Sequence, residues 1–207
     1  MGCRTILLDL DGTLYSVKDY PEFALHMDEV TGRRLRGALD APCDREAFEL
    51  LVEAQERHGF ASKSEALHAL FGFDLASMNR WREEHTEPER FLRRDADLAE
   101  ALARLASQFT LVLGTNSTRL LTERILATLG IPVSLLHAVV DSEMAGFAKP
   151  DRRFFEFLLA RVGGRSEEWL SVGDRLASDI EPAHELGMRA FHVSGPEQIV
   201  RLAAAVV

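Results

Sequence analysis

The stretch TILLDLDGTL, residues 5–14, joins a short apolar run to two aspartates and a glycine. The run 5–8 is uninterrupted, as expected for a strand that is buried on both faces of a sheet. Asp9 and Asp11 follow this run, and Gly12 is suited to a sharp turn because glycine tolerates positive φ angles. We therefore predict a buried strand that ends in an acidic loop.

Similar apolar runs recur later in the chain, at residues 110–113, 138–140, 169–172 and 190–193. Amphipathic helical patterns separate them, and Asp95, Ser117 and Asp151 are the expected N-caps. The alternation of buried strands with amphipathic helices is typical of an α/β protein. We predict a parallel sheet that is covered by helices on both faces.

The segment 16–94 differs from the rest of the chain, because it shows helical patterns and no convincing strand. Ser62 and Glu65 form an expected capping box within it. We predict an all-helical insert at 16–94 and a core built from 1–15 and 95–207. The last stretch, from residue 199 onward, is expected to be a helix that covers the edge of the sheet.

The composition limits the class of protein. The chain has 207 residues and a net charge of −9, with Lys and Arg scattered among Asp and Glu, which argues against nucleic-acid binding. Its two cysteines and seven histidines lack the spacing of zinc or iron ligands. No apolar stretch is long enough for a membrane span, and aspartates come too early for a signal peptide. We expect a cytoplasmic protein with no membrane partner.

Polar residues follow the predicted strands, where parallel sheets bind their ligands. These residues are Asp9, Asp11, Thr115, Asn116, Lys149, Asp174 and Asp179. Carboxylates alone would repel an anionic phosphate ester, but a divalent cation removes the conflict, and hard oxygen ligands favour Mg²⁺. One carboxylate can then attack phosphorus while another donates and accepts a proton. The set therefore predicts phosphoryl transfer.

Four segments resemble, in this order, the motifs of the haloacid dehalogenase-like hydrolase superfamily. They are DLDGTLY at 9–15, LVLGTNS at 111–117, AKPD at 148–151 and VGDRLASD at 172–179. The first is highly specific, while the others are informative through their order. The resemblance covers nearly the whole chain and implies a Rossmann-like core. It also implies that the helical insert is a C1 cap, which closes over the site.

The resemblance implies a reaction through an aspartyl-phosphate intermediate. Asp9 would be the nucleophile, and Asp11 would be the general acid and base. Thr115 and the backbone amide of Asn116 would bind the transferred phosphoryl group. Lys149 would hold both the nucleophile and the phosphoryl oxygens. The expected activity is therefore a phosphatase acting on a small phosphorylated metabolite, as a monomer or a homodimer.

The resemblance also implies a Mg²⁺ site. Asp9, Asp174 and the backbone carbonyl of Asp11 would bind the ion directly. Asp179 would act from outside this first coordination sphere. Ala148 and Arg175 depart mildly from the family pattern, and we expect the Arg175 side chain to face solvent rather than a substrate anion.

Several alternatives stay open at this level. A phosphosugar mutase would share all four motifs, and a non-catalytic binding protein would be expected to have lost some motif residues. A dehalogenase is disfavoured, because dehalogenases generally lack an aspartate at the position of Asp11. The flap residue Tyr15 and the later segment TNSTRL look most similar to pyrimidine 5'-nucleotidases, which implies nucleoside monophosphates as substrates. We expect Tyr15 to pack between core and insert rather than to stack on a base.

Overall fold

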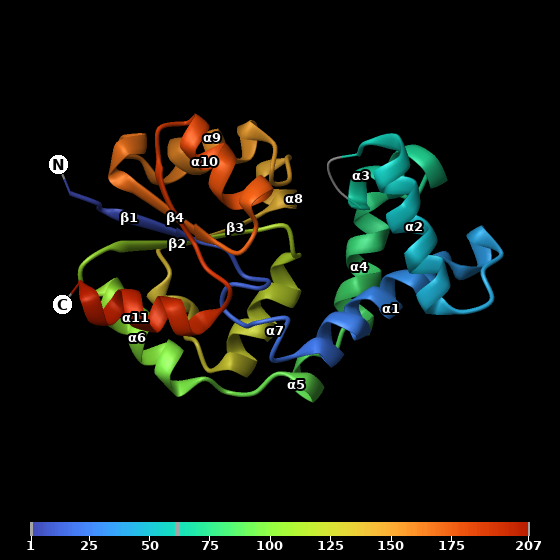
Figure 1. Cartoon of the computed structure of the whole chain (residues 1–207), viewed down its shortest axis with the longest axis horizontal. Coiled ribbons are helices and arrows are strands. Elements are labelled where there is room, and N and C mark those ends of the chain that lie inside the picture. The colour runs from blue at the N-terminus through green and yellow to red at the C-terminus, as the bar shows by residue number, and fades with distance from the viewer. Residues whose placement is uncertain (1, 61–62, 207) are drawn as a thin grey trace. The chain divides into compact units, whose positions relative to one another are not determined.

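The computed structural model describes residues 2–60 and 63–206 and separates into two compact units (Figure 1). The first, the core unit, comprises Met1–Tyr20 and Leu92–Val207. The second, the helical unit, is Pro21–Phe91. The predicted insert, 16–94, starts and ends a few residues outside this second unit.

The core unit is built on one parallel five-stranded sheet with the strand order β3-β2-β1-β4-β5. The strands are β1 (Thr5–Leu8), β2 (Thr110–Thr115), β3 (Ala138–Asp141), β4 (Trp169–Gly173) and β5 (Arg189–His192). β1 lies at the centre, and its four residues are all buried, as the uninterrupted apolar run predicts. The predicted α/β fold is confirmed.

Helices cover both faces of this sheet (Figure 1). One face carries α6 (Ala96–Ala106), α7 (Arg119–Leu129) and α11 (Pro196–Ala205). The other carries α8 (Ser142–Ala145), α9 (Arg152–Val162) and α10 (Glu181–Glu185). The predicted C-terminal helix is α11, which packs against α6 on a face of the sheet rather than at its edge, because its buried residues Ile199 and Ala203 need an apolar partner.

Short helical turns complete the core unit, at Val133–Leu135, Ser166–Glu168 and Leu176–Ile180. Two of the predicted N-caps are confirmed: Asp95 accepts from the backbone N–H of Leu98, and Asp151 accepts from that of Arg153, both at 2.9 Å. The third was wrong. Thr118 is the N-cap residue of α7, and the hydroxyl of Ser117 is bound to Asp11 instead.

The helical unit consists, over its described residues, of helices and connecting loops. The helices are α1 (Pro21–Leu39), α2 (Asp44–His58), α3 (Lys63–Phe71), α4 (Leu75–His85) and α5 (Pro88–Phe91). An apolar cluster holds α1 to α4 together, formed by Leu35, Ala47, Leu51, Ala66, Leu67 and Met78. The predicted capping box involves Ser62, which lies outside the described residues. The role of this unit as a cap stays a prediction.

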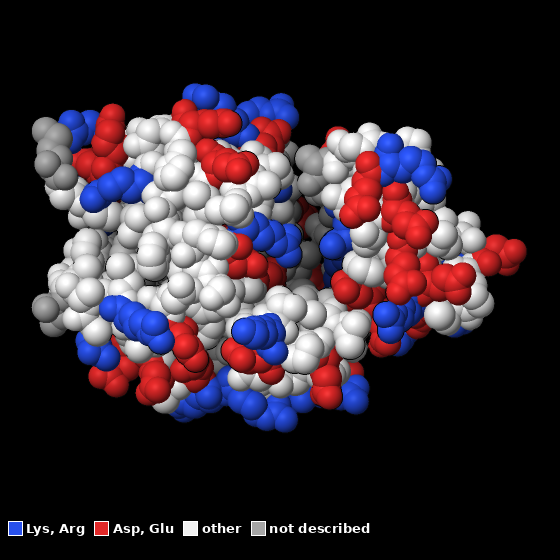
Figure 2. All heavy atoms as spheres, in the orientation of Figure 1, with Lys and Arg blue, Asp and Glu red and all other residues white. Residues whose placement is uncertain are grey.

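The surface carries mixed charge. On the face of the core unit in Figure 2, acidic and basic side chains are interspersed around an uncharged centre. None of the helices among residues 2–60 and 63–206 combines the length and apolar character that crossing a membrane requires.

Candidate active site

Three of the predicted site residues lie at the carboxyl ends of the three central strands, β2, β1 and β4. Asp9 follows β1, and its backbone N–H donates to the carbonyl of Val172 in β4 at 2.9 Å. Thr115 is the last residue of β2 and is fully buried. Asp174 follows β4 directly. The parallel sheet therefore brings residues that are far apart in sequence to one edge.

Lys149 is at the centre of the charged cluster. Its Nζ donates to Asp9 Oδ1 and to Asp179 Oδ1, each at 2.6 Å. The three side chains are only 5%, 10% and 3% exposed, respectively. These distances and this burial make the contacts charge-assisted hydrogen bonds shielded from water. Lys149 therefore fixes both carboxylates. The resemblance implied its contact with Asp9 but not its contact with Asp179.

The protonation properties of this cluster reflect its burial. Burial raises the pKa of Asp9 to about 7, against the opposing effect of Lys149, and the charges of Asp179 and Asp11 raise it further. Burial alone would lower the pKa of Lys149, but the two neighbouring carboxylates outweigh it, so this pKa lies above its ordinary value. Lys149 therefore stays positively charged, and this single cation does not neutralise all the negative charge of the carboxylates around it.

Asp174 gives the clearest indication of a cation site. Its Oδ1 is buried, and no atom of the described residues forms a hydrogen bond with it. Asp9, Asp174 and Asp179 each place a carboxylate oxygen within 4.8 Å of the others. A buried oxygen without a partner is costly unless an ion or water satisfies it. Three carboxylates facing one lysine fit a hard divalent cation.

Two glycines allow this close approach. A methyl group on Gly12 would lie 2.3 Å from Asp174 Oδ2, and Gly12 has φ of 86°. A methyl group on Gly173 would lie 2.4 Å from the Cβ of Asp179. Side chains at either position would push these aspartates away, so both glycines are part of how the carboxylates come together.

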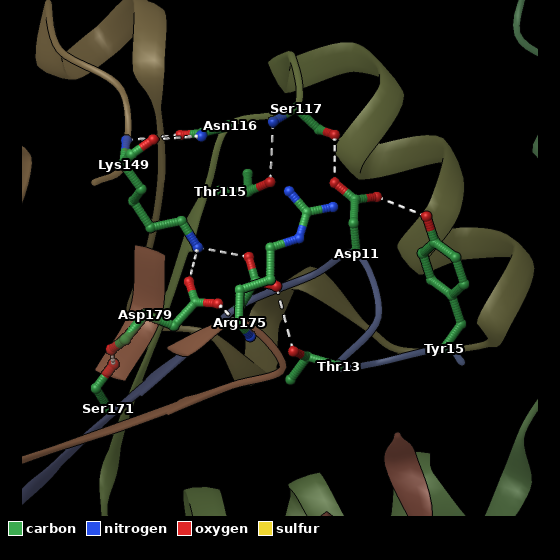
Figure 3. A network of polar contacts seen from close by, with 11 residues as sticks. Asp11, Thr13, Tyr15, Thr115, Asn116, Ser117, Lys149, Ser171, Arg175 and Asp179 are labelled. Carbon is green, nitrogen blue, oxygen red and sulfur yellow. Dashed lines mark hydrogen bonds and ion pairs between the residues drawn. The ribbon is translucent and has the colours of Figure 1, made fainter. Parts of the chain in front are cut away.

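Asp179 is engaged on both oxygens. Oδ1 accepts from Lys149, and Oδ2 accepts from the backbone N–H of Arg175 at 3.1 Å. Arg175 is exposed, but Figure 3 shows its side chain directed toward Asp11, and its charge opposes the rise in the pKa of Asp174 that burial causes. The expectation that this side chain faces solvent is therefore met only in part. With both oxygens occupied, Asp179 is better placed to orient Lys149 than to replace Asp174 as a ligand.

The loop after β2 holds the backbone of Lys149. The Asn116 side chain accepts from the Lys149 N–H and donates to the Lys149 carbonyl, both at 2.8 Å. Only the backbone amide of Asn116 was expected to act, so this side-chain role was missed. Thr115 Oγ1 accepts from the N–H of Ser117 at 3.0 Å, which fixes the loop beside the buried hydroxyl.

Asp11 and Asp9 are each held by residues that the sequence did not single out for this role. Tyr15 OH donates to Asp11 Oδ1 at 2.6 Å, and Ser117 Oγ donates to Asp11 Oδ2 at 2.7 Å (Figure 3). Thr13 Oγ1 donates to Asp9 Oδ2 at 3.2 Å. The only sequence signal was the proximity of Thr13 and Tyr15 to the two aspartates within the acidic loop.

Tyr15 is almost completely buried, with 1% of its surface exposed. Burial and the neighbouring charge of Asp11 raise the pKa of the Tyr15 phenol well above its ordinary value. The phenol therefore stays protonated, and in this structure its O–H donates to Asp11 Oδ1. Burial was expected for this residue, but the contact of its hydroxyl with Asp11 was not.

Comparison with known proteins places the fold and this site in one class. A model of the haloacid dehalogenase-like hydrolase family matches residues 3–187. The match covers most of the chain and includes all seven predicted site residues. The chain belongs to the haloacid dehalogenase-like hydrolase family.

Individual relatives show the same class. The chain is 50% identical over 50 residues to a glyceraldehyde 3-phosphate phosphatase of Methanocaldococcus jannaschii. That match spans 24% of this chain and 22% of the relative, so the chain covers about a fifth of the relative's length. Local identity of this kind carries no conclusion about the substrate.

Solved structures share the fold over nearly the whole chain. The HAD-hydrolase YfnB of Bacillus subtilis, in a structure bound to magnesium, has a TM-score of 0.65 at 18% identity, covering 98% of this chain and 99% of that chain. A HAD phosphatase from Thermococcus onnurineus has a TM-score of 0.64 at 22% identity, covering 92% and 86%. At these identities the likeness shows a common fold.

Proposed function

We propose that the protein is a Mg²⁺-dependent phosphatase that cleaves small phosphate monoesters through an aspartyl-phosphate on Asp9. The observation that carries this proposal is the buried Lys149 between Asp9 and Asp179, beside an Asp174 oxygen that lacks a partner among the described residues. This arrangement can neutralise a transferring phosphoryl group and leaves a place for a cation.

The first half-reaction transfers the phosphoryl group to the enzyme. An oxygen of Asp9 attacks phosphorus, and the bond from phosphorus to the ester oxygen breaks. Asp11 donates its proton to that oxygen, so the product leaves as a neutral alcohol. Lys149 keeps the attacking carboxylate in one orientation, because its Nζ is bound to Asp9 Oδ1.

The second half-reaction restores the enzyme. Water attacks phosphorus of the aspartyl-phosphate and gives its proton to Asp11, and the bond from phosphorus to Asp9 breaks. Inorganic phosphate leaves, and Asp11 is again protonated for the next cycle. Thr115 and the Asn116 backbone amide would bind the phosphoryl oxygens in both steps.

The cation site fits this chemistry. Asp9, Asp174 and the Asp11 backbone carbonyl would hold Mg²⁺, which when bound supplies positive charge next to the transferring group. The structure of YfnB, which has the same fold, was determined with magnesium bound. The raised pKa of Asp9 agrees with a site that lacks one positive charge.

For the substrate, we propose a small phosphorylated metabolite. The partial relative is a glyceraldehyde 3-phosphate phosphatase, and the resemblance of DLDGTLY together with TNSTRL suggests nucleoside monophosphates, so both classes of substrate belong in one panel. We also propose that the helical unit acts as the C1 cap and contributes specificity.

The proposal is tested by measuring phosphate release from triose, sugar and nucleoside monophosphates, first with Mg²⁺ and then with a chelator. We expect release that requires Mg²⁺ and that Asp9→Asn lowers by more than about 10³-fold. Asp97→Asn, which makes the same change at an exposed position of α6, serves as the matched control and should release phosphate normally.

Release that persists in Asp9→Asn would contradict the nucleophile assignment. No release from any ester, combined with transfer of phosphate between positions of a sugar phosphate, would identify a phosphomutase instead.

A further inference from the structure

Two hydroxyls from different parts of the core unit hold the Asp11 side chain. Tyr15 OH donates to Oδ1 at 2.6 Å, and Ser117 Oγ donates to Oδ2 at 2.7 Å. Figure 3 shows them on opposite sides of the carboxylate. With both oxygens bound, the carboxylate cannot rotate without losing a hydrogen bond.

The acidic loop itself places Tyr15 there. The Leu10 carbonyl accepts from the backbone N–H groups of Thr13 and Leu14, at 3.2 and 2.9 Å. Gly12, with φ of 86°, allows the chain to turn back. As a result, residues 11 and 15 form a β-bridge, and the phenol lies beside the carboxylate. The turn that positions Asp9 and Asp11 therefore also positions Tyr15.

The two donors differ in rigidity. The Tyr15 ring is buried, with 1% exposed, so packing fixes the position of its oxygen. Ser117 is half-buried and lies before α7, and its hydroxyl rotates about a single bond. The Tyr15 oxygen is therefore fixed in position, whereas the Ser117 hydroxyl can reorient.

We propose that Tyr15 is a positioning residue that holds Asp11 in the orientation needed for proton transfer. This inference rests on the proposed acid and base role of Asp11. The phenol oxygen is held at Oδ1 by packing, and the Ser117 hydroxyl at Oδ2 can rotate. When the ester bond breaks, the proton moves from the Asp11 carboxyl to the leaving oxygen, and both hydroxyls then donate to the carboxylate as they do in the structure.

The test uses substrates that differ in their need for an acid. An alkyl phosphate releases a poor leaving group that requires a proton, whereas p-nitrophenyl phosphate releases a stable phenolate that does not. The parameter is kcat/KM, because it reports the steps up to the first phosphoryl transfer. We expect Tyr15→Phe to lower kcat/KM by about 10–100-fold for the alkyl ester, and by only a few-fold for the aryl ester.

The matched control is Tyr20→Phe, which makes the same change at the other tyrosine of the chain. It should leave kcat/KM unchanged for both substrates. In an Asp11→Asn background, Tyr15→Phe should cause no further loss, since its effect passes through Asp11. Ser117→Ala should lower kcat/KM for the alkyl ester less than Tyr15→Phe does, because the rigid donor Tyr15 remains in place.

An equal loss on both substrates would show a merely structural role for Tyr15 and overturn the inference. So would a Ser117→Ala loss of more than about 100-fold on the alkyl ester, the upper bound expected for Tyr15→Phe, and this result does not depend on Tyr15→Phe folding. A wild-type protein that is inactive on both esters would instead refute the proposed function.

Discussion

The ion pairs at the sheet edge of the core unit and those on the helix surface of the helical unit lie in opposite environments. In the core unit, Lys149 pairs with Asp9 and Asp179, and the three side chains are 5%, 10% and 3% exposed. In the helical unit, Arg45 pairs with Glu49 on the surface of α2, and their side chains are 71% and 56% exposed. A contact between opposite charges is therefore desolvated at the sheet edge and hydrated on the surface of α2.

The difference indicates that the charged cluster at the sheet edge serves chemistry at some cost to the stability of the fold. Exposed pairs such as Arg45–Glu49 contribute little, because water screens them. Buried pairs lose their hydration, and hydrophobic residues of similar size are often as stable or more so. The helical unit is held together by its apolar cluster, whereas the sheet edge of the core unit concentrates charges that no packing requirement explains.

The largest change expected from breaking a buried pair is that of Lys149→Met. It leaves Asp9 and Asp179 buried without their cation, which should lower the free energy of unfolding at pH 8 by about 3–5 kcal/mol. Phosphatase activity should also be lost. Chemical denaturation and phosphate release measure the two effects.

Lys18→Met, at an exposed position of the core unit, is the matched control and should leave both properties nearly unchanged. Adding Mg²⁺ should recover part of the stability of Lys149→Met, because a cation would again face the carboxylates. If Lys149→Met and the wild type had equal free energies of unfolding, burying Asp9 and Asp179 without their cation would cost no stability, which would contradict this prediction.

The parallel sheet and the alternation of strands and helices along the chain could be predicted from the sequence, whereas the functional roles of the seven candidate site residues stay a prediction. β1 to β4 lie on the predicted apolar runs, and the residue after a strand decides what reaches the sheet edge, as Asp9 and Asp174 show. The buried run expected at 190–193 was wrong, because β5 (Arg189–His192) is an edge strand and is mostly exposed. Lys149 was predicted from its motif, although no strand ends there.

Contacts that depend on side-chain direction could not be predicted. Ser117 fits the pattern of a helix N-cap, but its hydroxyl binds Asp11, which is 106 residues away in sequence. The Asn116 side chain binds the Lys149 backbone, and the Tyr15 hydroxyl reaches Asp11 because of the turn at Gly12. Such contacts are set by tertiary structure, which periodicity and spacing do not specify.

A smaller effect is expected in the helical unit, where His26 is kept neutral. Its Nε2 accepts from the backbone N–H of Glu87 at 3.1 Å, and its ring stacks on Phe91. Burial lowers the pKa of His26 below its ordinary value of 6.5, so the stability it contributes is present above that pH. This stability is lost as pH falls through the lower folded-state pKa.

We therefore expect the difference in unfolding free energy between wild type and His26→Gln to shrink as pH falls from about 7 to about 5. Denaturation at a series of pH values measures it. His58→Gln, at an exposed position of α2, is the matched control and should show no such trend. A difference that grows toward low pH would contradict the neutral state of His26.

The most direct test of the account is to trap the phosphorylated enzyme. The protein is mixed with Mg²⁺ and p-nitrophenyl phosphate, quenched in acid within milliseconds and digested, and the peptides are fragmented in a mass spectrometer. Asp11→Asn should slow hydrolysis and increase the trapped fraction. We predict one phosphoryl group on Asp9, absent from Asp9→Asn. Turnover with no phosphorylated peptide, or with phosphate on another residue, would contradict the assignment of Asp9 as the nucleophile.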